Sequence, residues 1–359
     1  MIAYFGLVAY VAALGFVFSS LRKGRMERIL YLVLALSALY LMMSLRAPSV
    51  GIDTEAYEGY FMRIGTNPDY MNIVNSAPLY SVANRILYML WPDPQALLFF
   101  SAAIVCGGVG FFIYHCSQNI FLSTFFYITL YFFCNAMNGT RQAMAMSLCL
   151  VALTIAAKYR KVALVVLFSV LAVGVHNTSI IFVPFAFLPF LKITPKRLTR
   201  ISVAVVSAAA ILFVGLRPLV EFVSLNFPNY YSQYVDILFG EAFATSGRNI
   251  IQTAFLAALL YLYYQKCVKE KNDKLATSLF IPALFGIAMS AAFFQNYLLG
   301  ARIPLYFVVL FVAIIPNLIG SLGRNRFLLE VGTIGVSLVL FFILLYGNYA
   351  GVVPYEMVI

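Results

Sequence analysis

The chain alternates between long apolar runs and short basic segments over most of its length. Each run has the roughly 20 residues that a membrane-spanning helix needs, or a few fewer, which suffices where a helix ends in a protein cavity. The pattern therefore predicts an all-α polytopic membrane protein with about 12 transmembrane helices in a single domain, 1–359. The expected spans are 1–20, 29–45, 96–114, 120–137, 142–157, 162–175, 178–191, 201–216, 250–265, 275–294, 303–319 and 328–346.

Composition agrees with lipid as the main solvent of the side chains. Hydrophobic residues make up 63% of the chain and charged residues only 10%, whereas a soluble domain has about 25% charged residues. The net charge of +11 could suggest nucleic acid as a partner, but the cations lie in short tracts between apolar runs. We therefore expect membrane lipid, and no nucleic acid, as a partner.

The basic residues also predict the orientation. The loops at 21–28, 158–161, 192–200, 265–274 and 320–327 hold 17 of the 24 lysines and arginines. With 12 spans all five loops lie on one side, which the positive-inside rule makes cytoplasmic. Both termini then face outward, and the first apolar run is expected to be a retained helix because no basic segment precedes it.

The other seven cations are all arginines, whereas every lysine lies in a cytoplasmic loop. Arginine stays charged and binds planar oxyanions through a rigid fork of donors. An arginine-only set on the outer side favours a cavity that binds phosphate. The set is Arg46, Arg63, Arg85, Arg141, Arg217, Arg248 and Arg302.

Two outward loops are long, at 46–95 and 217–249. In the first, the stretch from Ala77 to Trp91 is amphipathic and predicts an interfacial helix anchored by Tyr88 and Trp91. Its apolar face comprises Leu79, Val82, Ile86, Leu87 and Leu90. The second loop is dense in aromatic residues, including Tyr230, Tyr231 and Tyr234, which disfavours disorder.

A short polar turn, Asn138 to Gln142, divides an otherwise continuous apolar stretch. Gly139 permits a tight turn, and Thr140 can cap the helix that follows. Arg141 in the first turn of that helix would lie beside free backbone N–H groups, which predicts an anion site. The alternative is an arginine that extends to the surface from a lipid-facing hairpin.

His176 lies at the tip of a second hairpin. Only about 30 residues separate the basic tracts at 158–161 and 192–200, and an arm of about 14 residues covers roughly 21 Å. His176 is therefore expected below the outer surface in a protein-lined cavity, where an imidazole could act as a base. The alternative is a histidine that merely caps the hairpin together with Asn177.

Two further groups of arginines lie at the outer level. Pro48 and Gly51 allow Arg46 and Asp53 to converge, either as a structural salt bridge or as a catalytic carboxylate held by arginine; the sequence does not decide between them. Arg248 and Arg302 each lie near the start of an expected span.

Motifs for other chemistry are absent from the sequence. The chain has no Walker loop, HExxH or GxSxG pattern, and its five cysteines include no CxxC pair. These patterns would indicate ATP hydrolysis, zinc or nucleophilic-serine chemistry. We expect no cofactor and no metal.

The polar clusters resemble the EpsG-type branch of the Wzy polysaccharide polymerases. The matching elements are an Arg-x4-Gly-x-Asp-x3-Tyr run, an Asn-x-x-Arg-Gln turn, and a hairpin-tip histidine followed by a serine, within residues 40–190. The residues are Arg46, Gly51, Asp53, Tyr57, Asn138, Arg141, Gln142, His176 and Ser179.

The resemblance implies a GT-C-like, metal-independent glycosyltransferase of the bacterial inner membrane. It would polymerise oligosaccharide repeat units carried on undecaprenyl diphosphate at the periplasmic face, with a chain-length regulator protein as a possible partner. Arginines would stabilise the departing diphosphate, His176 or Asp53 would act as the base, and tyrosines would contact the sugars. The expected site is catalytic His176, Asp53 and Arg141; diphosphate-binding Arg46, Arg141, Arg248 and Arg302; sugar-binding Tyr57, Gln142, Asn177, Tyr230, Tyr231 and Tyr234.

Two alternatives remain open. An O-antigen ligase would use the same donor with a lipid A–core acceptor, which the sequence does not distinguish. A transporter or flippase for an anionic lipid-linked substrate should carry polar residues at the bilayer midplane. The charged residues of this chain are expected at the outer boundary instead.

Overall fold

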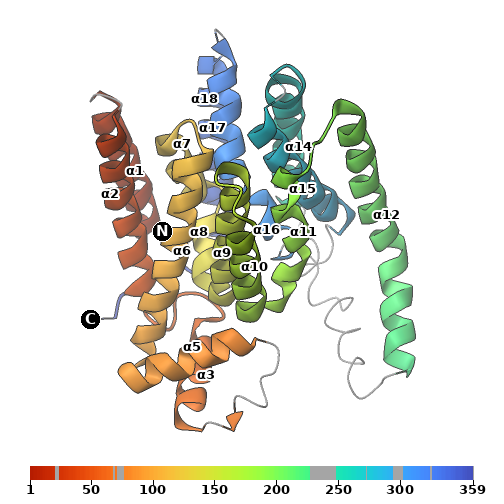
Figure 1. The fold of residues 1–359 in the computed structure, drawn as a ribbon. Coiled ribbons are helices and arrows are strands. Elements are labelled where there is room, and N and C mark those ends of the chain that lie inside the picture. Colours follow the sequence, from red (N-terminus) through yellow and green to blue (C-terminus); the bar gives the residue numbers. More distant parts are fainter. Residues whose placement is uncertain are drawn as a thin grey trace. The chain divides into compact units, whose positions relative to one another are not determined.

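The fold is taken from a computed structural model that describes residues 1–20, 24–67, 69–70, 77–226, 248–271, 273–293, 302–323 and 326–358. Its regular elements in these ranges are helices (Figure 1). The chain divides into two compact units, Met1–Phe190 with Ile319–Ile359 and Leu191–Leu318. Each unit is described by itself.

Six described helices are long and apolar enough to cross a membrane, and a seventh span results if one bent helix pair is counted. The chain is therefore a multi-pass membrane protein. Twelve spans remain a prediction, because several expected spans are shorter or broken. The six helices are α1 (Ile2–Ser20), α2 (Arg25–Ser44), α6 (Pro94–Cys116), α9 (Thr140–Lys158), α15 (Lys274–Ala292) and α18 (Arg326–Tyr346).

Helix α9 forms the centre of the first unit and packs against α6 and α10 (Val162–Val175). A Cβ atom on Gly108 of α6 would lie 2.9 Å from the carbonyl oxygen of Ser147 on α9. Only glycine allows this approach of the two backbones, as is common where membrane helices pack.

The bent pair consists of α7 (Ile120–Thr129) and α8 (Phe132–Asn138), which meet at an angle of 54°. Tyr131 between them is buried and has a φ of 72°. This left-handed conformation is rare for a residue with a side chain and interrupts the helix within the apolar stretch. The predicted span 120–137 is thus two short helices.

The predicted span 178–191 is wrong as a continuous helix. The chain there forms η1 (Asn177–Ile181), α11 (Val183–Ala186) and η2 (Leu188–Phe190). Pro184 and Pro189 each lack a backbone donor, which explains the short pieces. The expected short hairpin is confirmed, because α10 has only 14 residues and is followed at once by His176.

The long loop at 46–95, predicted to face outward, contains α3 (Thr54–Thr66) and α5 (Pro78–Leu90), which pack together (Figure 1). The predicted helix at Ala77–Trp91 is confirmed as α5. Its apolar residues Val82, Ile86 and Leu90 are exposed, as an interfacial helix requires.

The polar face of α5 points into the protein instead of toward water. Tyr80, Ser81 and Asn84 are its buried residues. The predicted anchor Tyr88 also turns inward, because its ring packs against Phe61 at a centroid distance of 5.7 Å. Of the two predicted anchors, only Trp91 is exposed.

A segment after α18 pairs with the loop that follows α2. The backbone N–H of Ala47 donates to Glu356 at 2.9 Å, and that of Gly51 donates to Gly351 at 2.8 Å. The Tyr355 hydroxyl donates to the carbonyl of Met42 at 2.9 Å. Residues 347–358, here named the C-terminal clasp, therefore hold the start of the first outward loop.

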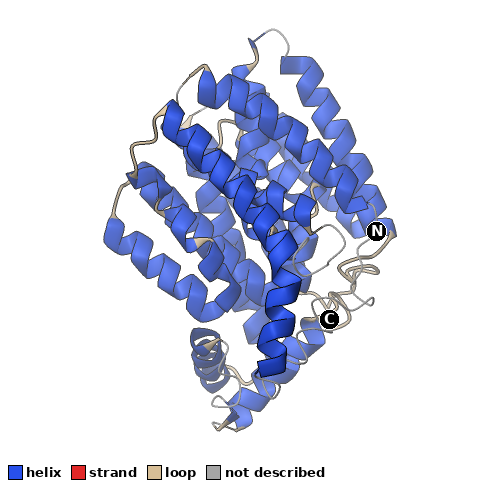
Figure 2. Cartoon of the chain, turned by 90° about the vertical axis from the view of Figure 1, so that its right-hand side faces the viewer, coloured by secondary structure: helices blue, strands red, loops and turns tan. Residues whose placement is uncertain are grey.

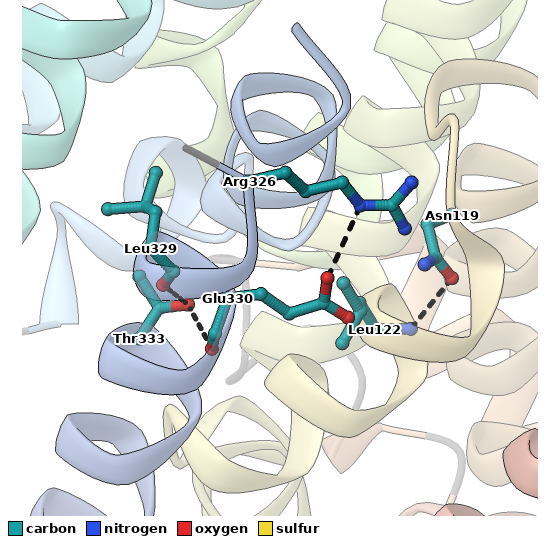
Figure 3. A network of polar contacts seen from close by, with 6 residues as sticks. All are labelled: Asn119, Leu122, Arg326, Leu329, Glu330 and Thr333. Atoms are coloured by element: carbon teal, nitrogen blue, oxygen red, sulfur yellow. Dashed lines mark hydrogen bonds and ion pairs between the residues drawn. The ribbon is translucent and has the colours of Figure 1, made fainter. Parts of the chain in front are cut away.

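The N-terminal ends of α7 and α18 carry local polar contacts (Figure 3). The amide oxygen of Asn119 accepts from the backbone N–H of Leu122 and caps α7, while Arg326 and Glu330 form an ion pair on α18. The Thr333 hydroxyl donates to carbonyls of its own helix only. These contacts stabilise helix ends without linking distant segments.

The second unit contains α12 (Pro195–Asn226), α14 (Arg248–Tyr263), the π-helix η4 (Tyr264–Lys269), α15, α16 (Leu305–Val308) and α17 (Phe311–Ser321). The last residues of α17 belong to the first unit. The described parts of the chain are helices joined by loops throughout (Figure 2). The predicted loop 217–249 begins too early, because helix α12 continues through residues 217–226 despite Pro218.

Candidate functional site

The turn between α8 and α9 is the point where the predicted polar clusters of the first unit meet. Arg46 follows α2 and is fully buried. Its guanidinium donates to the Thr140 hydroxyl at 3.0 Å and to the carbonyl of Met43. Burial lowers the pKa of Arg46 to about 10, so the group stays charged at neutral pH. Arg46 is thus a buried cation bonded to the turn.

Asp53 is attached to the same turn through its backbone. Its N–H donates to the side-chain oxygen of Asn138 at 2.9 Å. Gly51 has a φ of 96°, and a Cβ there would lie 3.0 Å from the carbonyl oxygen of Met137. Glycine is required both for this conformation and for the approach of the loop to the turn. Arg46 and Asp53 are thus each bonded to the turn, while the predicted pairing of the two side chains, as a salt bridge or as a catalytic carboxylate held by arginine, stays a prediction.

Thr140 does not cap α9, contrary to the sequence prediction. The N-cap residue is Gly139, which has no side chain to accept from the first N–H groups of the helix. Thr140 instead accepts from Arg46 and donates to the carbonyl of Met137 at 3.2 Å. The hydroxyl therefore links the buried arginine to the end of α8.

Arg141 lies in the first turn of α9, as predicted, and is partly exposed. Its guanidinium carbon lies 5.6 Å from the centroid of the Tyr80 ring, which places a cation over an aromatic face. The Tyr57 ring in turn meets Tyr80 edge to face at 6.3 Å. Helices α3, α5 and α9 thus each contribute one side chain to this group.

Several buried polar atoms near this group make no hydrogen bond within the described part of the chain. They are the Arg141 Nε, the Tyr80 hydroxyl and both polar atoms of the Asn84 amide. Asn84 lies one helical turn after Tyr80 on α5 and interacts with the Tyr80 hydroxyl, but the contact falls short of the geometry of a full hydrogen bond. Because more than about nine in ten buried polar groups are bonded, this cluster of unbonded atoms is unusual.

The end of α10 lies beside the start of α5. A Cβ on Gly174 would lie 2.3 Å from the side chain of Leu79. His176, two residues later, is partly buried, and its carbonyl accepts from the backbone N–H of Ser179 at 3.0 Å. His176 therefore lies at the end of a short hairpin, and its position below the outer membrane surface stays a prediction.

The remaining predicted sugar-binding residues differ in accessibility. Gln142 is partly buried beside Arg141, and Asn177 is exposed. Tyr230, Tyr231 and Tyr234 lie outside the described residues.

Two of the expected diphosphate-binding arginines belong to the second unit. Arg248 is the first residue of α14, and Arg302 is partly buried shortly before α16. Arg46 and Arg141 are brought to one turn of the first unit.

Two other outward arginines have local structural contacts. Arg85 donates to the carbonyls of Ile64 and Gly65 at the end of α3. Arg63 is exposed, and its nearest side-chain partner is the Tyr70 hydroxyl at 3.5 Å. The arginine-only pattern therefore includes residues that stabilise the loop.

Glu58 was not singled out from the sequence. It lies half-buried on α3, and burial raises the pKa of its carboxyl although the positive charge of Arg46 lowers it. A carboxyl beside a buried arginine with a raised pKa is a feature of acid–base sites. Its position, five residues after Asp53 on a helix, was the only signal in the sequence.

Comparison with known proteins gave one match. The sequence model of the EpsG family matches residues 28–357, which is nearly the whole chain. No curated protein and no solved structure matched.

Proposed function

The chain belongs to the EpsG family, and we propose that it is a membrane glycosyltransferase that polymerises oligosaccharide repeat units carried on undecaprenyl diphosphate. The proposal includes a GT-C-like arrangement of about 12 transmembrane helices in the bacterial inner membrane. The site would face the periplasm, as the loop charges predict. A chain-length regulator protein is a proposed partner.

The observation that carries the proposal is the cluster of buried, unbonded polar atoms around Arg141. A buried polar atom without a partner costs about 1–3 kcal/mol, so a cluster of them is unfavourable in the protein alone. Arg141 Nε, the Tyr80 hydroxyl and the Asn84 amide are suited to the oxygens of a sugar diphosphate. A ligand of this class would supply the missing hydrogen bonds.

The reaction is the transfer of a glycosyl group between two lipid-linked molecules. A hydroxyl oxygen of the acceptor sugar forms a bond to the anomeric carbon of the donor, and the bond from that carbon to the phosphate oxygen breaks. The lipid diphosphate leaves with the electron pair, and the hydroxyl proton passes to a base. The charge therefore grows on the diphosphate, where a preorganised cation lowers the barrier.

Arg141 is suited to bind that diphosphate. It is partly exposed, lies in the first turn of α9 where free backbone N–H groups add positive potential, and keeps its Nε unbonded. Arg46 is fully buried and bonded to Thr140, the residue before Arg141. We therefore assign Arg141 the contact with the diphosphate and Arg46 the positioning of the turn, with Arg248 and Arg302 as further candidates from the second unit.

Three groups can serve as the base. Asp53 is held at the turn by Asn138, His176 lies at the recessed hairpin, and Glu58 has a raised pKa. A raised pKa brings a carboxyl closer to the value at which it can both take and release a proton. Tyr57, Gln142, Asn177 and the tyrosines at 230, 231 and 234 are proposed to contact the sugars.

The test is a reconstituted reaction. Purified protein is incubated with an undecaprenyl-diphosphate-linked repeat unit without nucleotide or added metal, and the products are separated by size. A ladder of polymers is expected, and Arg141→Ala should abolish it. The control is Arg63→Ala, because Arg63 is an exposed arginine of α3 without a role in the cluster.

Two outcomes would count against the proposal. Folded protein that makes no polymer from the correct repeat unit, but transfers it to a lipid A–core acceptor, is a ligase. A ladder of wild-type length from Arg141→Ala would remove Arg141 from the diphosphate site.

A further inference from the structure

A second site begins at the N-terminal end of α2, the end opposite Arg46. An open groove of about 700 Å³ runs between α2 and α6. Arg25 at the start of α2 and Tyr40 near its end both line the groove. Their separation of 15 positions along a helix corresponds to about 22 Å, which is longer than one leaflet of the roughly 30 Å hydrocarbon core.

The walls of the groove are apolar and its floor is formed by small residues. Val33 and Ile29 contribute exposed apolar surface from α2. On α6, a Cβ at Gly110 would meet the Leu36 side chain at 2.4 Å, whereas a Cβ at Gly107 would meet nothing within 4 Å. The helices therefore touch at Gly110 and leave open space at Gly107, which is suited to a hydrocarbon chain.

Positive charge gathers at one end of the groove. Arg25 lines it, and the guanidinium of Arg28 lies over the Tyr114 ring at 5.2 Å while donating to the Tyr114 carbonyl. Lys158 at the end of α9 lies close enough to act electrostatically on His115, another lining residue.

One carboxylate lies at the same end. The Glu27 side chain turns back to Gly24, the residue before Arg25, where its oxygen lies 2.2 Å from the position of an added Cβ. Three cations against one carboxylate leave this end of the apolar groove positively charged. Basic pockets between transmembrane helices on the cytoplasmic side are binding sites for anionic lipid headgroups.

We propose that this groove binds an anionic phospholipid of the leaflet that faces the basic loops. One acyl chain lies between α2 and α6 over Gly107, and the phosphate lies among Arg25, Arg28 and Lys158. The site is separate from the turn that holds Arg141, because α2 and α9 run from one site to the other. The inference does not depend on glycosyl transfer.

The experiment measures lipid binding to the purified full chain by native mass spectrometry in detergent. Phosphatidylglycerol is compared with zwitterionic phosphatidylcholine at equal concentration. We expect the wild type to retain phosphatidylglycerol preferentially. Arg25→Gln should weaken this binding about fivefold, the change for about 1 kcal/mol per basic residue, while Arg63→Gln in the outward loop should not change it.

A second variant tests the position of the acyl chain. Gly107→Leu places a side chain in the open part of the groove without a clash at Cβ, and it should weaken retention of phosphatidylglycerol at least as much as Arg25→Gln. The control is Gly335→Leu on α18, where a Cβ also meets nothing within 4 Å. Equal retention of both lipids by the wild type, or an unchanged affinity of Gly107→Leu, would overturn the proposal.

Discussion

Substitution of Thr140 tests whether the buried arginine holds the α8–α9 turn in place. The Thr140 hydroxyl accepts from Arg46 at 3.0 Å, and Arg46 is fully buried with its Nε already unbonded. Thr140→Val keeps the shape of the side chain but removes this acceptor. A hydrogen bond to a charged group contributes about 1.5–3 kcal/mol, so we expect a loss of stability of that size.

The assay is unfolding of the detergent-solubilised protein by denaturant or heat. Thr333→Val is the matched control, because the Thr333 hydroxyl is also buried but bonds only to backbone carbonyls of its own helix. It should cost about 0.5–1.5 kcal/mol, as an ordinary hydrogen bond does. The difference between the two variants isolates the contact with Arg46.

Thr140→Ser restores a hydroxyl at the same position and should recover most of the loss. The proposed positioning role also predicts that Thr140→Val shortens the polymer ladder although Arg141 is unchanged. If Thr140→Val unfolds under the same conditions as Thr333→Val, the contact with Arg46 does not stabilise the turn and the reasoning fails.

Three further predictions concern the same region. Gly51→Ala should be strongly destabilising, because Gly51 has a φ of 96° and faces backbone. Gly59 lies inside α3 and a Cβ there meets nothing within 4 Å, so Gly59→Ala should stabilise the protein by about 0.5–1 kcal/mol in the same unfolding assay. Burial raises the pKa of the Glu58 carboxyl in the folded protein, so the contribution of Glu58 to stability is present at low pH and is lost as pH rises through that pKa. Glu58→Gln should flatten this part of the stability–pH curve. An unchanged curve would exclude Glu58 as the source of the pH dependence. Tyr355→Phe removes the bond to the Met42 carbonyl and should cost about 0.5–1.5 kcal/mol, measured by unfolding, with no change if the C-terminal clasp contributes nothing.

Features that depend on local physics could be predicted from the sequence. Hydropathy predicted spans that begin at 29 and 142, within four residues of the observed helix starts at Arg25 and Thr140, and the short distance between two basic tracts predicted the short hairpin at His176. Each of these inferences needs only the length of a helix and the thickness of a bilayer. Prolines at 184 and 189 could also have warned that the span 178–191 would break.

The inward face of α5 could not be predicted in this way. An amphipathic helix at an interface normally directs its polar face to water, but Tyr80 and Asn84 are buried in the protein. Nothing in the spacing distinguishes the two cases, because the difference arises from the packing of α3 and α10 against α5. Glu58 escaped notice for the same reason, since only the fold brings it near Arg46.

The C-terminal clasp has a consequence for biosynthesis. Tyr355 and Met42 are 313 residues apart in the sequence, which a ribosome working at about 5–20 residues per second covers in about 15 to 60 s. Throughout that interval α2 can already be inserted in the membrane, but the C-terminal clasp that pairs with the loop around Arg46 has not yet been synthesised. A nascent chain arrested after α15 would hold Arg46 in an incomplete environment. The site is therefore assembled after insertion, when the late residues reach the early ones, and not in the order in which the helices are made.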